Sequence, residues 1–409
     1  MPTFEKMLLL AFVFACTTLS FATTPLQPGD RVAIVGNTYA DQLRLHGYLE
    51  TLLLQRTSGN EISIRNLGWG GDTLTVRDRP TNFISEKDTL SEHKTDLIIA
   101  CFGMGESFDG MDGIGEFKKN LKAFLASHKG MKYNGKSAVR LVLVSPIAQE
   151  DLGPSTPNTD QRNEDIKTYA LAMEQVCSQE KIPFINLYEV TAALLGDRNA
   201  PRITENGIRL NEYGYWATAR TVADFLIRPT PPWFLKINAK TLESEGKGLS
   251  IGEIDSDDKK QRFSFSVLEK TAPQLAPPVS GQIHQVPQST RDLLVVKGLS
   301  PGKYLLQVDG LVVALGTHLE WSNGLLVDQS PAHREAEAFR MKVNDKNLQF
   351  TYSWKALNQV HIVGERKKSP AGAALPDEVI RFNELAILRD AELRETRSPK
   401  TRRWQLIRQ

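Results

Sequence analysis

A hydroxyl-bearing residue follows an apolar run near the start of the chain. The run Val32–Gly36 is rich in β-branched residues and stops at the polar pair Asn37 and Thr38, after which a helical pattern begins. Such a run is typical of a central parallel strand, and open α/β sheets bind ligands beyond the carboxyl ends of their strands. Thr38 is therefore a candidate nucleophile, which would need a base to take its proton, or a binding group with Asn37 beside it.

Three further side chains are candidates for the walls of the same cleft. Trp69 and Asp72 stand in a glycine-rich stretch after a second apolar run, and Glu106 follows a third. Trp69 could stack on a sugar ring or pack beneath its loop, and the two carboxylates could line the cleft or cap backbone amides. Ser107 is a poor nucleophile candidate because Gly105–Asp109 lacks the final glycine of a nucleophile elbow.

Alternating apolar runs and helical patterns position these residues. Strands are expected near Val32–Gly36, Ile62–Asn66, Leu97–Phe102, Leu141–Ser145 and Phe184–Leu187. Leucine or other apolar spacing predicts helices over Ala40–Gln55, Phe117–Leu125, Ile166–Val176 and Tyr213–Leu226. The pattern predicts a doubly wound α/β domain over residues 23–228.

The composition changes after three prolines, at Pro229, Pro231 and Pro232, that end the last helix. Short alternating runs separated by turn residues predict a mainly β domain over residues 229–368, organised as a sandwich, with an exposed loop at 269–289. The expected strands are Phe263–Leu268, Leu293–Val296, Tyr304–Val308, Leu311–Leu315 and Phe350–Trp354. Residues 369–409 predict a polar, solvated tail with one helix from Asp377 to about Glu395 and a basic end.

The first 22 residues have the features of a secretory signal peptide. Lys6 precedes the apolar stretch Met7–Ala15, and small residues lead to a cleavage site after Ala22. The apolar stretch is shorter than the roughly 20 residues that a membrane span needs. We expect the mature chain to be secreted or periplasmic, with lipid attachment at Cys16 as the alternative.

Composition and cysteine use point to no cofactor or nucleic-acid partner. The 409-residue chain has a formal net charge of +2, without one concentrated basic face interleaved with aromatic residues. No metal-ligand spacing is present, and no cofactor is expected. Beyond the signal peptide, Cys101 and Cys177 are expected to be two separately buried free thiols, although a disulfide between them is the alternative.

Four stretches, in order and each beside a strand or helix end, resemble the SGNH or GDSL hydrolase family. These stretches are Val35–Thr38, Asn66–Thr73, Phe102–Glu106 and Asn206–Gly214. The resemblance implies a flavodoxin-like, three-layer α/β fold and an esterase that hydrolyses ester bonds, for example those of acylated carbohydrates. It covers about half of the chain and implies no cofactor or metal.

The same resemblance places substitutions at the residues that carry the family's chemistry. Thr38 stands at the nucleophilic serine, Gly105 at the oxyanion asparagine, Asn206 at the aspartate and Arg209 at the histidine, and only the Gly71 amide is retained. Arginine is always protonated in proteins and cannot act as a base. Efficient hydrolysis by the family mechanism is therefore not expected.

Another histidine of the chain could replace the lost base. His46, His93 and His128 are expected at the surface of the first domain. A second-domain histidine could reach the cleft across a domain interface, and the candidates are His284, His318, His333 and His361.

Two classes of function follow from these residues. One is an SGNH-type esterase with an altered active site, and the other is a non-catalytic extracytoplasmic binding module, a pseudoenzyme. For the second class, Arg209 beside Thr38 and the Gly71 amide favours an anion such as an acidic saccharide, unless Arg209 pairs with Asp72, Glu106 or Glu212. A small-molecule or saccharide ligand is expected in either case.

Overall fold

The computed structural model describes residues 24–57, 62–79, 83–197, 200–278, 291–355, 368–395 and 399–409. The signal peptide expected at residues 1–22, with Cys16, lies outside the described residues, as do His284, His361 and most of the 269–289 loop. Within the described part, no helix is both long and apolar enough to cross a bilayer.

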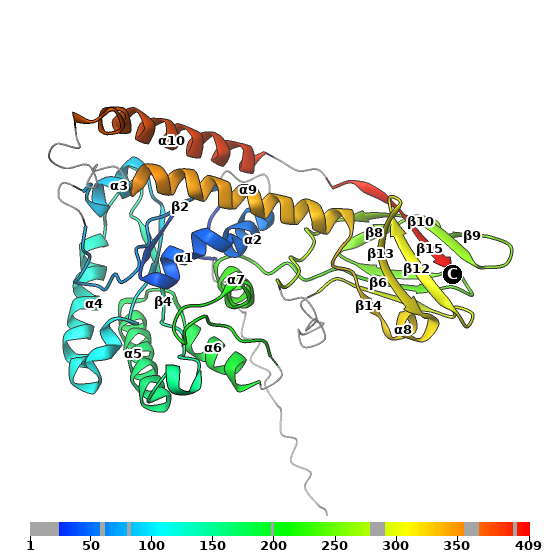
Figure 1. The fold of residues 1–409 in the computed structure, drawn as a ribbon, viewed down its shortest axis with the longest axis horizontal. Helices are drawn as coiled ribbons and strands as arrows, with labels where there is room; N and C mark the ends of the chain where they lie inside the picture. The colour runs from blue at the N-terminus through cyan, green and yellow to red at the C-terminus, as the bar shows by residue number, and fades with distance from the viewer. Residues whose placement is uncertain are drawn as a thin grey trace, which may run out of the picture.

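A five-stranded parallel sheet organises the first half of the chain (Figure 1). Its strands run in the order β2-β1-β3-β4-β5, so the order reverses around β1, where α/β sheets open a ligand crevice. The strands are β1 (Arg31–Gly36), β2 (Ser63–Asn66), β3 (Leu97–Cys101), β4 (Arg140–Val144) and β5 (Phe184–Ile185). The five predicted strands and the α/β class are confirmed.

Helices cover both faces of this sheet and divide its core in two. On one face lie α1 (Thr38–His46), α2 (Tyr48–Arg56), α6 (Leu187–Gly196) and α7 (Glu212–Leu226). On the other face lie α3 (Glu86–Glu92), α4 (Ile114–His128) and α5 (Thr159–Glu180). Along β1, Val32 and Ile34 point into the first core and Ala33 and Val35 into the second, as the two-residue period of a strand requires.

The single helix predicted over Ala40–Gln55 is in fact two helices, α1 and α2. Gly47 separates them with φ +65°, a left-handed conformation that glycine adopts easily. A Cβ at this position would come within 2.2 Å of the Asn344 side chain, which approaches from a helix later in the chain. The break therefore reflects packing that local leucine spacing does not reveal.

Two sheets enclose one core in the β-rich region, as expected for a sandwich. One sheet runs β13-β12-β15-β10-β8 with β9 beside β10, and the other runs β14-β11-β6-β7. Their shared core is centred on three fully buried tryptophans, Trp233, Trp321 and Trp404. The elements are β6 (Phe234–Asn238), β7 (Ser244–Lys247), β8 (Leu249–Ile251), β9 (Asp255–Ser256), β10 (Arg262–Glu269), β11 (Leu293–Lys297), β12 (Lys303–Val308), β13 (Leu311–Thr317), α8 (His318–Asn323), β14 (Leu325–Leu326) and β15 (Thr401–Arg408).

The expectation of a solvated basic tail is wrong. β15 lies between β10 and β12 and pairs with both in antiparallel register, so the end of the chain is a central strand of its sheet. Arg402, Trp404 and Leu406 are buried at alternate positions. Arg403 and Gln405 alternate with them and are more exposed, so the strand has an ordinary two-residue period that the two adjacent arginines hide.

The strand predicted at Phe350–Trp354 is also wrong, because these residues end a 24-residue helix, α9 (Pro331–Trp354). Phe350 and Trp354 are four residues apart and stack with ring centroids 6.1 Å apart on the buried face of α9. Five residues with aromatic side chains at the first, third and last positions fit both the two-residue period of a strand and the spacing of a helix. The 24-residue helix shows that the second interpretation is correct. The predicted helix in the last segment is confirmed as α10 (Pro370–Arg394), which begins earlier than expected.

Helices α9 and α10 pack beside each other and lie across the α/β domain along the edge strand β2 (Figure 1). Lys346 of α9 donates to the carbonyl of Ile64 on that edge at 2.8 Å, and Ser63 donates to Asp390 of α10 at 2.6 Å. Since an uncovered edge strand invites unwanted pairing, this cover protects the sheet. The segment after the proline linker therefore includes a helical layer of the first domain as well as a β domain.

Both cysteines of the described chain are buried free thiols, which confirms the expectation for Cys101 and Cys177. Burial raises the pKa of the Cys177 thiol to about 12, so this thiol stays protonated. Neither cysteine is a candidate nucleophile.

Candidate functional site

The junction of β1 and α1 sets Thr38 at the carboxyl end of the sheet. Asn37 caps α1 by accepting a hydrogen bond from the Tyr39 amide at 3.0 Å, while its own amide donates to the Cys101 carbonyl at 3.0 Å. Gly36 has φ +121°, and a Cβ there would lie 2.0 Å from the Cys101 oxygen. Only glycine allows this close approach of β1 to β3, and it leaves Thr38 half-buried at the first position of α1.

The loop after β2 is tied to the same junction by Asn66. The Asn66 side chain donates to the Ala40 carbonyl at 2.7 Å and accepts from the Gly68 amide at 2.8 Å. A Cβ at Gly68 would lie 2.4 Å from the Asp41 amide, so the loop rests directly on α1. The two loops are thus held as one unit.

This contact brings the glycine-rich stretch beside Thr38. A Cβ at Gly70 would lie 3.7 Å from the Thr38 hydroxyl oxygen. Gly71 is exposed with φ +88°, and its amide makes no hydrogen bond within the described residues. The structure thus places the hydroxyl beside the loop that carries the one backbone donor kept from the family pattern.

Glu106 joins the loop after β3 to the loop after β2. Its carboxylate accepts from the amides of Leu74 and Gly103, both at 2.9 Å. Burial raises the pKa of the Glu106 carboxyl, and the two amide donors oppose the shift. Glu106 therefore caps backbone amides, which is one of its two expected roles, the other being to line the cleft.

The space beside Gly105 is occupied by the neighbouring loop. Gly105 has φ −65°, which any residue can adopt, yet a Cβ there would lie 2.8 Å from the Thr73 methyl carbon. The Thr73 methyl therefore stands where an asparagine side chain at position 105 would begin. Gly105 therefore packs closely against the Thr73 side chain.

Asp72 and Trp69 take part in packing with charged neighbours. Both oxygens of buried Asp72 bind Arg79, at 2.8 and 2.6 Å. The Arg79 guanidinium lies 4.5 Å from the Trp69 ring centroid, and the Lys355 ammonium lies 4.6 Å from it. Trp69 also meets Trp354 edge-on. These contacts match the packing alternative for Trp69 rather than an open platform for a sugar.

The fourth stretch of the family resemblance, Asn206–Gly214, begins with a tight turn before α7. The Asn206 side chain accepts from the amides of Arg209 at 2.9 Å and Ile208 at 3.3 Å, which holds the turn. Arg209 is exposed and forms an ion pair with Glu205, one turn earlier in the chain. The alternative pairing of Arg209 with Asp72, Glu106 or Glu212 is therefore wrong. Among them, Glu212 binds the Tyr48 hydroxyl at 3.0 Å instead.

The first-domain histidines are more buried than expected and none reaches Thr38. His46 stacks on Tyr215 at 4.8 Å, and His128 is buried with its ring nitrogen 2.9 Å from the Tyr133 hydroxyl. Burial lowers the pKa of both, and it lowers the pKa of His93 to about 3. Surface positions were predicted because polar neighbours in the sequence hid these packing contacts.

A Ser–His–Asp chain does occur in the second region, away from Thr38. His333 Nδ1 lies 2.7 Å from the Ser330 hydroxyl, and Nε2 lies 2.9 Å from Asp292. Ser330 is fully buried and caps α9, and Asp292 also accepts from the Trp233 amide at 2.8 Å. This chain holds the start of α9 in place. His318 lies on α8, where its Nδ1 accepts from the Gly302 amide, so neither histidine completes the Thr38 site.

The assembled site offers a hydroxyl and an unused amide, with an ion-paired arginine on the loop before α7. Within the described residues, no group of three His, Cys, Asp or Glu side chains could hold a metal ion. Among the side chains that the structure describes, none forms a hydrogen bond with the Thr38 hydroxyl, which can therefore hydrogen-bond to a ligand.

Residues 29–217 match the model of the GDSL-like lipase/acylhydrolase family, so the chain contains a GDSL-like lipase/acylhydrolase domain over these residues. A solved structure described as a gut microbial diltiazem-metabolizing enzyme superposes with a TM-score of 0.72 at 17% identity, over 95% of this chain and 99% of that one. An acetylxylan esterase from Geobacillus stearothermophilus is similar at 13% identity with a TM-score of 0.38, over 49% of this chain and 96% of its own. No curated protein matches the chain. The first likeness extends the shared fold to the β-rich region and α9.

Proposed function

We propose that the GDSL-like domain is an extracytoplasmic binding module that does not hydrolyse esters by the family's serine mechanism. The observation that carries the proposal is Arg209, which stands at the base position with its side chain turned to Glu205. A permanently protonated guanidinium cannot accept the proton of a hydroxyl. Thr38 then has no route to the alkoxide that attack on an ester needs.

The other substitutions support the same function. Removing one oxyanion donor typically lowers turnover by about 10²–10³, and losing the nucleophile or base costs up to about 10⁶. Gly105 supplies no side-chain donor, and the Asn206 oxygen is engaged with two amides of its own turn. The fold is kept while the groups that would stabilise the transition state are replaced.

The ligand we propose for this module carries an acidic group, such as a uronate or a sulfated sugar. Arg209 already has a partner, yet the side chains of Arg209 and Glu205 are 46% and 47% exposed. Exposed ion pairs contribute only about 0–1 kcal/mol, so a ligand carboxylate can compete for the guanidinium. The signal peptide expected before residue 23 would bring the module to extracellular saccharides.

Hydrolysis of short acyl esters tests the loss of activity. We expect the purified chain to hydrolyse p-nitrophenyl acetate at a rate that Thr38→Ala leaves unchanged within twofold, because any residual rate comes from other surface groups. Thr38→Ser is the matched control and should also leave the rate unchanged. A drop of tenfold or more in Thr38→Ala would show that Thr38 is a working nucleophile and would refute the proposal.

Removing the competing carboxylate tests the proposed acidic ligand. Glu205→Gln frees the Arg209 guanidinium, and we expect the affinity for galacturonate to rise by about fivefold, since an exposed pair is worth up to about 1 kcal/mol. Isothermal titration calorimetry measures the affinity, with Glu189→Gln on α6 as an exposed control. An unchanged or weaker affinity in Glu205→Gln would exclude Arg209 as the anion-binding group.

A further inference from the structure

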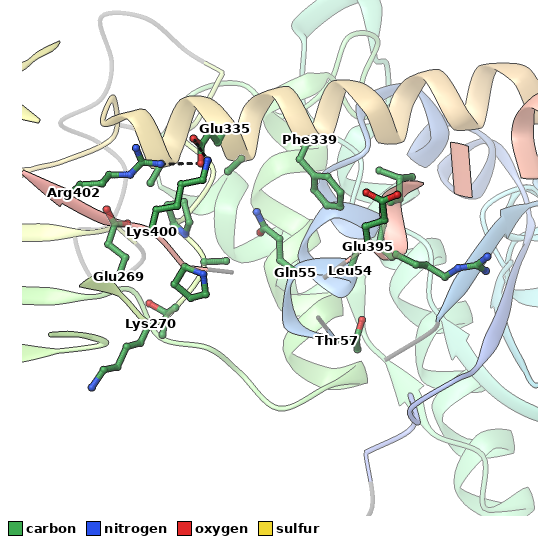
Figure 2. Close-up of a pocket in the computed structure, with 18 residues that line it drawn as sticks. Leu54, Gln55, Thr57, Glu269, Lys270, Glu335, Phe339, Glu395, Lys400 and Arg402 are labelled. Atoms are coloured by element: carbon green, nitrogen blue, oxygen red, sulfur yellow. Dashed lines mark hydrogen bonds and ion pairs between the residues drawn. The ribbon is translucent and has the colours of Figure 1, made fainter. Parts of the chain in front are cut away.

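A second site lies between the two regions of the chain, apart from Thr38. A cavity of about 330 Å³ opens between α2, α9 and the β-rich sheet (Figure 2). Its apolar wall consists of buried side chains from α2, α9 and α10, namely Leu54, Ala336, Phe339 and Leu393. Cavities at domain interfaces with such walls are preferred places for small ligands, and this volume suits a compact one.

One buried carboxylate lines this cavity without a partner. Glu269, the last residue of β10, is 8% exposed, and neither of its carboxylate oxygens has a hydrogen-bond partner among the described residues. Burial raises the pKa of this carboxyl, and Asp292 adds to the effect, while His333, Arg402 and the donor side chain of Trp233 oppose it. Native proteins rarely leave such a group unsatisfied, so a ligand donor is expected there.

The basic side chains around Glu269 are already neutralised by other carboxylates. Arg402 binds Glu335 at 2.9 Å and Asp309 at 3.0 Å, and Lys400 binds Glu335 at 3.2 Å. Figure 2 shows the ammonium end of Lys270 directed away from the cavity. Of the three carboxylates that line the cavity in the described part of the chain, Glu335 is ion-paired and Glu395 is exposed, so Glu269 is the buried acidic group without an ion pair beside the apolar wall.

We propose that this cavity binds a small organic cation, an ammonium group on a compact apolar or aromatic body. The ammonium donates to Glu269 on the β-rich side of the cavity, and the body packs against Phe339 and Leu54 on the helical side. A charge-assisted hydrogen bond to a desolvated carboxylate is among the stronger polar contacts, which favours an amine over a neutral or acidic analogue. This site is independent of whether the GDSL-like domain hydrolyses esters.

Calorimetry on the full chain with three probes of similar size tests the proposal. We expect 2-phenylethylamine to bind at least tenfold more tightly than 2-phenylethanol or phenylacetate. Glu269→Gln should weaken binding of the amine at least tenfold, because the carboxylate charge is lost. Glu395→Gln changes an exposed carboxylate on the rim of the same cavity and should alter the affinity less than twofold.

A filled cavity gives a second, independent test. Ala336→Leu places a larger side chain against Phe339 and should abolish amine binding while near-UV circular dichroism stays native. Three results would overturn the proposal: equal affinities for the amine and phenylacetate, amine binding that survives both Glu269→Gln and Ala336→Leu, or no binding of the amine at millimolar concentration.

Discussion

Replacing Lys346 by methionine is expected to lower the free energy of unfolding by about 3–5 kcal/mol, the cost of breaking a buried ion pair from one side. Lys346 is fully buried on α9 and pairs with Glu50 on α2, which is itself 7% exposed. Glu50 also accepts from Asn347 at 2.8 Å, and Lys346 satisfies the Ile64 carbonyl on β2. The substitution therefore leaves the buried Glu50 carboxylate without its counter-ion and the Ile64 carbonyl without its hydrogen-bond donor.

Urea unfolding followed by circular dichroism measures this effect. Lys342→Met on the exposed side of the same helix is the matched control and should change stability by less than about 0.5 kcal/mol. Adding Glu50→Gln to Lys346→Met removes the stranded charge and should recover a large part of the loss. Equal stabilities of the Lys346→Met and Lys342→Met proteins would mean that α9 does not depend on this pair.

Restoring the family residues is expected to create esterase activity at least about 10³-fold above that of the unmodified chain. The variant combines Thr38→Ser, Gly105→Asn, Asn206→Asp and Arg209→His. Asn206→Asp keeps the oxygen that accepts from the turn amides, so the fourth stretch should hold its shape. Together these changes return the nucleophile, oxyanion donor, orienting carboxylate and base to one site.

One supporting substitution follows from the packing at position 105. The Thr73 methyl would lie 2.8 Å from the new Cβ, so Thr73→Ser is added to remove the methyl while keeping the hydroxyl that accepts from Val76 at 2.8 Å. The control is the same variant with Arg209 left in place, which lacks the base and should stay inactive. A fully folded variant without activity would mean that the loop after β2 and the loop before α7 do not meet around Thr38.

The α/β domain could be predicted because its elements follow local rules. The central strands β1, β3 and β4 are nearly continuous apolar runs, and α4, α5 and α7 carry apolar residues at helical spacing. The order of the four stretches that resemble the hydrolase family then indicated which loops meet at the end of the sheet. The break at Gly47 was not predicted because the leucine spacing continues across it, although a glycine with φ +65° that ends α1 is a local signal.

The second region shows where local patterns are insufficient. Strands β10 to β13 show a clear alternation of apolar and polar residues between turns. β15 is recognisable only from the alternating apolar residues Trp404 and Leu406, because the arginines nearby make the segment look like a solvated tail. Helix α9 was missed because its buried face includes polar groups such as Lys346, whose partners lie on α2 and β2. Such polar burial is visible only in the folded structure.

The candidate site was partly predictable for the same reason. The family resemblance implied that Arg209 stands at the position of the base, and the apolar run before Thr38 predicted that Thr38 lies at a strand end. The partners were not predictable, since Arg79 for Asp72 and Glu205 for Arg209 depend on loop geometry. The cavity at Glu269 had no sequence signal, because its walls come from segments far apart in the chain.

Covalent trapping tests the loss of the family chemistry most directly. The unmodified chain and the restored variant are incubated with a fluorophosphonate, which reacts with activated serine or threonine hydroxyls, and the adducts are located by peptide mass spectrometry. We predict no adduct at Thr38 in the unmodified chain and a stoichiometric adduct at position 38 of the restored variant. A stoichiometric adduct on Thr38 of the unmodified chain would contradict the account, because it would show a base activating that hydroxyl.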